Sequence, residues 1–272
     1  MFNIIKINIG KLKLWIILLA CILKVGCAGI APKEFIALPD TAKQQISSSK
    51  FVFIHSQDEL NATVIASNIS QATGGGLLVA LADTAITNNR AKEAEKLLAP
   101  IRSELIDFDM DKEITQALLP VLKSTAWLHA KNISDIKIMH GNSTEIINKL
   151  SNDATNNKDV VGVISSSYVL NAGFTTLEVV VALELYPLNI NLKKLTAHSA
   201  NNNSQNQLQP IYKTKVICNK HLETATKNFK ENAKLWSLNN GYAIKHAIKD
   251  AITTITLQLK EKLQDPEKEI QE

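Results

Sequence analysis

The pattern of apolar and polar positions divides most of the chain into short strands and amphipathic helices. β-Branched and aromatic runs bounded by polar residues are typical of strands, and they occur at 50–55, 135–140, 159–169 and 211–218. Between 174 and 186, apolar residues alternate with threonine, glutamate and small residues, which predicts an antiparallel strand with one buried face. The Asn171-Ala172-Gly173 triplet before it predicts a hairpin turn.

Helical periodicity accounts for much of the remainder. Apolar residues recur at the spacing of one helix face in five segments, at 88–98, 101–123, 142–150, 223–235 and 241–263. Pro120 lies inside the second of these and is expected to kink or break it. The last segment carries a long apolar stripe that must be buried against the sheet. The order of the elements predicts an α+β fold, with a mixed, largely antiparallel sheet and helices packed on it.

The first 26 residues have the organisation of an export signal. Lys6, Lys11 and Lys13 precede an apolar run at 14–23, and no acidic residue occurs among them. A basic stretch, about 7–15 apolar residues and small residues at the cleavage site are typical of a secretory signal peptide. The run is too short for a transmembrane helix, which needs about 20 residues. An uncleaved signal anchor and a buried helix are the alternatives.

Two cysteines at the end of this signal resemble the lipidated cysteine of bacterial lipoproteins. Cys27 follows Val25 and Gly26 and precedes a Pro-containing tether, although Lys24 stands where the lipoprotein pattern has an aliphatic residue. Cys21 follows a fair match of aliphatic and small residues, but its lipidation would leave two large apolar residues beside the lipid. We favour Cys27, with Cys21 as the alternative and an ordinarily cleaved, unlipidated signal as the third option.

The resemblance implies an anchor on the outer membrane, with the domain facing the periplasm. Neither Ala28 nor Ile22, which follow the two cysteines, is the aspartate that retains many bacterial lipoproteins on the inner membrane. The implied partners are membrane lipid, through the acylated cysteine, and other envelope proteins. The predicted organisation is a signal peptide at 1–26, the cysteine and tether at 27–49, a single α/β sandwich domain at 50–264 and a frayed tail at 265–272.

The charge and the cysteine content of the chain do not alter the predicted lipoprotein organisation. The formal net charge is +4 at pH 7 and comes partly from the signal. The mature chain therefore lacks the concentrated basic stripe of a nucleic-acid-binding protein. Cys218 lies in an apolar strand pattern and is predicted to be a buried structural thiol. If Cys21 is the lipidated residue, Cys27 is free to form a disulfide with Cys218 in an oxidising compartment.

A glycine-rich apolar segment is the candidate interaction site. Three glycines precede an apolar run, but the Gly-Lys-Ser/Thr ending of a phosphate-binding loop is missing, which favours a flexible turn into a helix. We expect this segment to face a partner or the membrane. Its candidate contact residues are Gly74, Gly75, Gly76, Leu77 and Leu78.

No catalytic or metal-binding pattern is recognisable along the chain. The six histidines are scattered, and neither a zinc-binding spacing nor a nucleophile motif accompanies them. Asp107, Asp109 and Asp111 alternate like calcium ligands, but Lys112 and Leu118 replace the glycine and glutamate of an EF-hand loop. The three aspartates are therefore interpreted as a solvated helix face. We expect no enzyme activity, no cofactor and no metal ion.

The whole pattern resembles an uncharacterised class of Gram-negative outer-membrane lipoproteins. The resemblance rests on the lipidated cysteine with its tether, the glycine-rich segment, the strand pair at 160–186 and Trp236 before a terminal amphipathic helix. At fold level the chain is also similar to the N-terminal domain of TolB and to curli-secretion lipoproteins. The likeness at fold level carries no function by itself. A tethered domain without recognisable chemistry and with a glycine-rich apolar segment instead predicts a non-catalytic structural or assembly subunit of a cell-envelope complex, such as a secretion apparatus, and leaves an oligomer open. The alternatives are a periplasmic regulator or chaperone that binds a cell-wall synthase or cargo, and an enzyme with an unrecognised site.

Overall fold

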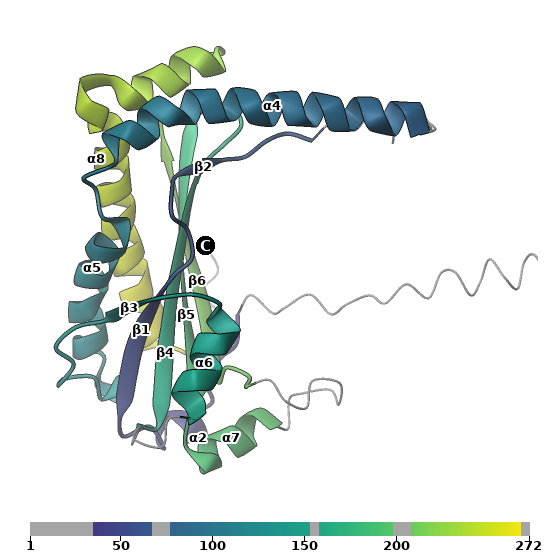
Figure 1. Ribbon diagram of the computed structural model, residues 1–272. Helices are drawn as coiled ribbons and strands as arrows, with labels where there is room; N and C mark the ends of the chain where they lie inside the picture. The colour runs from purple at the N-terminus through teal and green to yellow at the C-terminus, as the bar shows by residue number, and fades with distance from the viewer. Residues whose placement is uncertain (1–34, 67–76, 153–157, 198–207, 268–272) are drawn as a thin grey trace, which may run out of the picture. The chain divides into compact units, whose positions relative to one another are not determined.

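The computed structural model describes residues 35–66, 77–152, 158–197 and 208–267. Glu34–Glu272 form one compact unit, and its described elements are shown in Figure 1. In chain order they are α2 (Asp40–Lys43), β1 (Ser49–His55), β2 (Asn61–Ala62), α4 (Leu77–Glu104), α5 (Met110–Ser124), η1 (Ala126–Leu128), β3 (Lys137–His140), α6 (Ser143–Asn152), β4 (Val160–Leu170), β5 (Thr176–Pro187), α7 (Ile190–Ala197), β6 (Tyr212–His221) and α8 (Phe229–Gln264).

The strands form one mixed, mostly antiparallel open sheet in the order β3-β1-β4-β5-β6, with β2 pairing the end of β4. β1 runs parallel to both β3 and β4, whereas β4, β5 and β6 form a long antiparallel meander. Helices pack against this sheet (Figure 1). The predicted α+β class is therefore confirmed, and so is the hairpin between β4 and β5, where the Phe174 amide donates to the Asn171 carbonyl.

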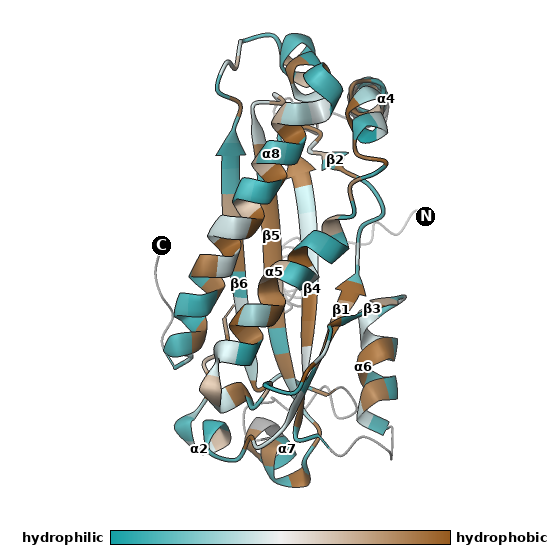
Figure 2. Cartoon of the chain, turned by 90° about the vertical axis from the view of Figure 1, so that its left-hand side faces the viewer, coloured by the Kyte–Doolittle hydropathy of each residue, from teal (hydrophilic) through white to brown (hydrophobic). Residues whose placement is uncertain are grey.

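The two faces of the sheet are covered by different helices. On one face Phe51 and Phe53 of β1 belong to the main core, which includes buried residues of α4, α5 and α8. Figure 2 shows α5 and α8 crossing this face. On the other face Val52 and Ile54 belong to a smaller cluster with the apolar residues of α6. Because successive side chains of a strand point to opposite faces, β1 is buried on both sides.

The helix boundaries differ from the sequence prediction. The predicted helix at 101–123 is wrong as a single element, because α4 continues to Glu104 and α5 begins only at Met110. The break has a local cause, since the Asp109 side chain caps α5 by accepting a hydrogen bond of 3.0 Å from the Lys112 amide. Pro120 does not break the helix, because α5 continues through it to Ser124.

The long α8 consists of two helical segments joined by a left-handed turn. Asn239, Asn240 and Gly241 have φ values of 54°, 57° and 67°, which are costly for most residues. Gly241 is also sterically required, because a Cβ atom there would lie 2.6 Å from Cβ of Glu104 at the end of α4. The turn therefore allows α4 to approach α8 closely. The first segment begins at Phe229, later than the predicted start at 223.

The folded unit extends beyond the predicted domain of residues 50–264. It includes residues at both ends that were predicted to form the tether and the frayed tail. Leu38, Ala42 and Ile46 are buried in the main core. Ile36 pairs with Lys213 of β6, and the Leu38 amide donates to the Pro266 carbonyl at 3.0 Å. Residues 35–49 and 265–267 are thus packed parts of the domain. Cys218 is buried in the main core, as predicted from its apolar strand pattern, whereas Cys27, its alternative disulfide partner, lies outside the described residues.

Candidate functional site

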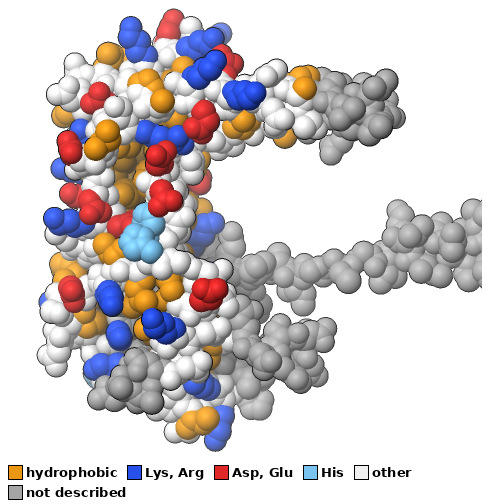
Figure 3. Space-filling view, in the orientation of Figure 1, with side chains coloured by type: hydrophobic (Ala, Val, Ile, Leu, Met, Phe, Trp, Pro, Cys, Tyr) orange, Lys and Arg blue, Asp and Glu red, His pale blue; other side chains and the backbone are white. Residues whose placement is uncertain are grey.

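The polar side chains of interest lie along the segment that follows β1, from His55 to Ile65. β1 and β3 are parallel neighbours, and His55 is paired in register with His140, each as the last residue of its strand. The two imidazole rings lie 4.7 Å apart, measured between centroids. Figure 3 shows histidine side chains gathered on this face beside acidic ones. In open sheets with parallel strands, ligands commonly bind outside the carboxyl ends of the strands.

Both ring nitrogens of His55 contact carboxylates. Nδ1 lies 2.5 Å from Oδ2 of Asp111 in the first turn of α5, and Nε2 lies 2.8 Å from Oδ1 of Asp58 in the loop after β1. The two aspartates differ greatly in burial, because the side chain of Asp111 is 14% exposed and that of Asp58 is 95% exposed. His55 therefore joins a half-buried acid on a helix to a solvent-facing acid on a loop.

These contacts determine the charge of His55. The hydrogen bond to Asp111, and then that to Asp58, raise the pKa of the His55 imidazole above its ordinary value and outweigh the lowering caused by burial. Only a protonated imidazole can donate from both nitrogens at once. Tyr168 on β4 stays neutral beside this cluster, since burial is the main cause that raises its pKa to about 12.

The contacts of the cluster suit the holding of a positive charge on His55. Both nitrogens of His55 are engaged by acids, and the nearby Ser56 hydroxyl donates to the Ser166 carbonyl at 2.5 Å. Across the described ranges, no group of three or more His, Cys, Asp or Glu side chains is placed to hold a metal ion. The arrangement can therefore bind and release one proton while connecting three parts of the chain.

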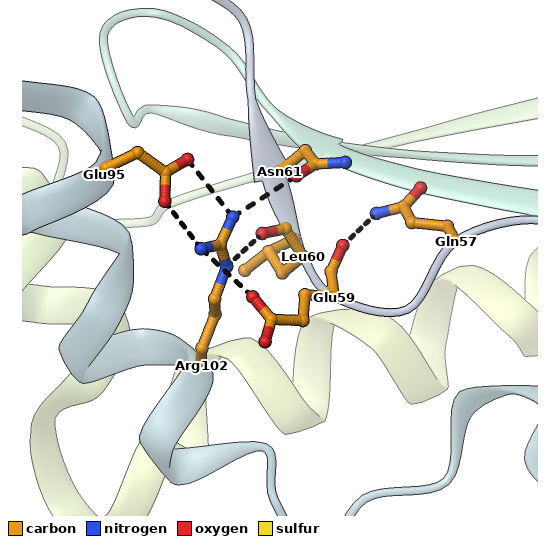
Figure 4. Close-up of polar contacts among 6 residues, drawn as sticks. All are labelled: Gln57, Glu59, Leu60, Asn61, Glu95 and Arg102. Carbon is orange, nitrogen blue, oxygen red and sulfur yellow. Dashed lines mark hydrogen bonds and ion pairs between the residues drawn. The ribbon is translucent and has the colours of Figure 1, made fainter. Parts of the chain in front are cut away.

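An arginine on α4 fixes the next part of the segment, as Figure 4 shows. Arg102 Nε donates to the Leu60 carbonyl at 2.7 Å, and Nη1 lies 2.7 Å from Glu95 and 3.1 Å from Glu59. Nη2 also reaches the Asn61 side chain at 3.3 Å. Because a planar guanidinium presents several donors in a rigid fork, Arg102 holds the backbone and side chains of the segment against α4.

Gln57 fixes the segment to the sheet in a different way. Its Nε2 donates to the Tyr168 carbonyl at 2.7 Å and to the Glu59 carbonyl at 2.6 Å, and its Oε1 accepts from the Tyr168 amide at 3.1 Å. The side-chain amide thus pairs with β4 as a neighbouring strand would. The segment is consequently held between α4 and the sheet before it reaches β2.

Beyond β2 the same segment forms one wall of an apolar groove of about 380 Å³. The other walls come from the middle of α4, the β4–β5 hairpin and the start of α8. Ile65 and Phe229 are 64% and 36% exposed at this groove. Two polar contacts border it, from Arg90 to the Ile65 carbonyl at 2.9 Å and from Lys230 to Glu93 at 2.8 Å. The groove is lined by Thr63, Val64, Ile65, Arg90, Glu93, Ala94, Ala172, Phe174 and Phe229.

Exposed apolar residues lie at this groove and further along α4 and α8. Among the described residues seven large hydrophobic side chains are exposed: two of them line the groove, two lie in or beside the turn within α8, and one follows the end of α4. α4 and the first segment of α8 lie together in Figure 1. We call this surface the apolar end, defined by Ile65, Ile106, Phe229, Leu238 and Tyr242.

The residues selected from the sequence are only partly described by the structure. Leu77 and Leu78 open α4, whereas Gly74, Gly75, Gly76 and the two candidate lipidation sites lie outside the described residues. Asp111, interpreted as part of a solvated helix face, instead contacts His55. One signal could have indicated the His55 cluster, because two predicted strands, 50–55 and 135–140, each end in histidine.

No family model matches the chain, and no curated protein or solved structure matches it significantly. None of the described helices is both long enough and apolar enough to cross a membrane.

Proposed function

We propose that the chain is an exported lipoprotein, anchored through Cys27 at the periplasmic face of the outer membrane, whose domain is a non-catalytic structural or assembly subunit of a cell-envelope complex. The observation that carries the proposal is the apolar end. Contiguous exposed apolar surface rimmed by polar groups commonly marks a site of protein–protein or membrane interaction. The groove at Ile65 and Phe229 has this composition, with Arg90, Glu93 and Lys230 at its border.

The composition of the groove suits the apolar side chains of a partner protein. Interfaces commonly combine an apolar centre with a polar rim. Here the centre consists mainly of aliphatic and aromatic side chains. The histidine cluster agrees with a non-catalytic role in its protonated form, because both ring nitrogens of His55 are then paired with acids.

The apolar end is tested by substituting its two groove residues. We expect Ile65→Ser combined with Phe229→Ser to reduce cross-linked or co-purified partner by about tenfold or more, since central apolar contacts contribute about 1–2 kcal/mol each to binding. Leu257→Ser is the matched control, because Leu257 is 59% exposed on α8 but outside the apolar end. Quantitative mass spectrometry of cross-linked envelopes measures the effect. Equal recovery with both variants, at unchanged thermal stability, would contradict this interface.

The anchor is tested by the intact mass of protein extracted from membranes with detergent. We expect a mature chain that begins at Cys27 and carries acyl chains, and we expect Cys27→Ser to lose this mass and to leave the membrane fraction. A mature chain that begins at acylated Cys21 would keep the anchor but move it. An unacylated chain would overturn the lipoprotein assignment while leaving the apolar end to be judged by its own test.

A further inference from the structure

We propose that His55 is a pH-sensitive latch that fastens the loop after β1 to the domain through Asp58 while Asp111 holds the ring in place. The arrangement of His55 between two carboxylates supports this proposal. The ring stands between two carboxylates, at 2.5 Å from Asp111 and 2.8 Å from Asp58. These acids come from two different elements, α5 and the loop, and the ring itself stands at the end of β1.

Loss of one proton changes the two contacts unequally. A protonated imidazole donates two hydrogen bonds, and a neutral one donates a single hydrogen bond and offers an acceptor at its other nitrogen. A carboxylate facing that acceptor loses its attraction. Asp58 is 95% exposed and can be fully hydrated, whereas Asp111 is only 14% exposed and would remain poorly solvated without its donor. The neutral ring therefore keeps Asp111 and releases Asp58.

Among the described residues, the titratable groups nearest His55 come from α5, β3 and the loop after β1. α5 contributes Asp111, the loop contributes Asp58, and β3 contributes His140, whose ring is 4.7 Å away. Near Tyr168, which stays neutral, lie Glu59 and the Arg102 guanidinium. Glu59 and Arg102 are themselves paired at 3.1 Å. A titration must therefore distinguish the signal of the His55 ring from that of the neighbouring His140 ring.

The latch acts on a short stretch. Gln57 remains paired with Tyr168, and Arg102 remains bonded to the Leu60 carbonyl, because neither contact depends on the His55 proton. The freed residue is therefore Asp58, because Glu59 is still held by Arg102 through its carboxylate and by Gln57 through its carbonyl. Asp58 lies between β1 and the wall of the apolar groove, so the latch makes this one position of the loop sensitive to pH.

The sign of the effect follows from linkage. Since the pKa of His55 is raised in the folded protein, its contribution to stability is complete below the ordinary histidine pKa of about 6.5 and is lost as pH rises through the folded value. We expect the destabilisation by Asp58→Asn to be present at pH 5.5, as an about two- to fivefold change in the unfolding equilibrium constant. At pH 9 the same variant should match the wild type.

Nuclear magnetic resonance of the compact unit Glu34–Glu272 gives the direct test. We expect the His55 ring to titrate above the ordinary histidine range, the backbone amide signals of Asp58 and Glu59 to shift with the same midpoint, and Asp58→Asn to lower that midpoint. His140→Gln is the control, because it removes the neighbouring ring and leaves both hydrogen bonds of His55. A His55 midpoint unchanged by Asp58→Asn, or loop signals that follow His140 instead, would overturn the latch.

Discussion

Replacing Trp236 by alanine is expected to lower the free energy of unfolding by about 3–5 kcal/mol, the usual cost of removing a large buried aromatic side chain. Trp236 is 1% exposed, and its Nε1 donates to the Phe174 carbonyl at 2.8 Å. It therefore joins the first segment of α8 to the β4–β5 hairpin. The neighbouring Asn232 strengthens the same junction by donating to the Gly173 carbonyl at 2.9 Å. Removal of the indole therefore has two costs, because it leaves a cavity and it leaves the Phe174 carbonyl without its donor.

Urea unfolding followed by far-ultraviolet circular dichroism measures this effect. Trp236→Phe separates its two parts, because phenylalanine refills most of the cavity but leaves the Phe174 carbonyl without its donor, at a cost of about 1–3 kcal/mol. Tyr242→Ala is the control, since Tyr242 is 66% exposed on the same helix and should change stability by no more than about 0.5 kcal/mol. Similar losses for Trp236→Ala and Tyr242→Ala would show that the tryptophan is not a packing centre.

The second large effect is expected from Gly162→Ala, which should destabilise the protein by about 1–3 kcal/mol through overpacking. Gly162 of β4 is the register partner of Phe51 on β1. A Cβ atom at Gly162 would lie 2.3 Å from two ring carbons of Phe51 and 3.2 Å from Leu185. Phe51 is 2% exposed, so its ring cannot move away without disturbing the main core.

Thermal unfolding of a double-mutant cycle tests this explanation. Phe51→Leu is destabilising by itself, but in the Gly162→Ala background it removes the clash, so the two changes together should cost less than their sum. Gly173→Ala is the matched control, because the nearest atom to its added Cβ would be 3.6 Å away. Strict additivity of Phe51→Leu and Gly162→Ala would contradict a steric origin.

Local patterns determined most of the individual elements. The alternation at 174–186 predicted β5, whose apolar positions, including Leu177 and Leu183, are buried in the main core. Both strand and helix periods depend only on residues close in sequence, so the strands other than β2, the final helix and the α+β class followed from them. The lipoprotein signal is equally local in the sequence, and it stands as a prediction.

The helix ends were less predictable, because they depend on single capping contacts. Asp109 looks like its neighbours Asp107 and Asp111 in the sequence, yet only its side chain caps α5. The same cap places Asp111 in the first helical turn, where it reaches His55. Asp109 and Asp111 thus acquired different roles from backbone geometry.

The histidine cluster and the apolar groove were decided by tertiary structure alone. His55 and His140 meet because β1 and β3 are parallel and in register, and a register that differed by one residue would turn one ring to the other face of the sheet. The groove likewise combines Ile65 and Phe229 from distant parts of the chain. Pairing and packing between distant segments depend on the whole set of contacts, which is why no local pattern contains them.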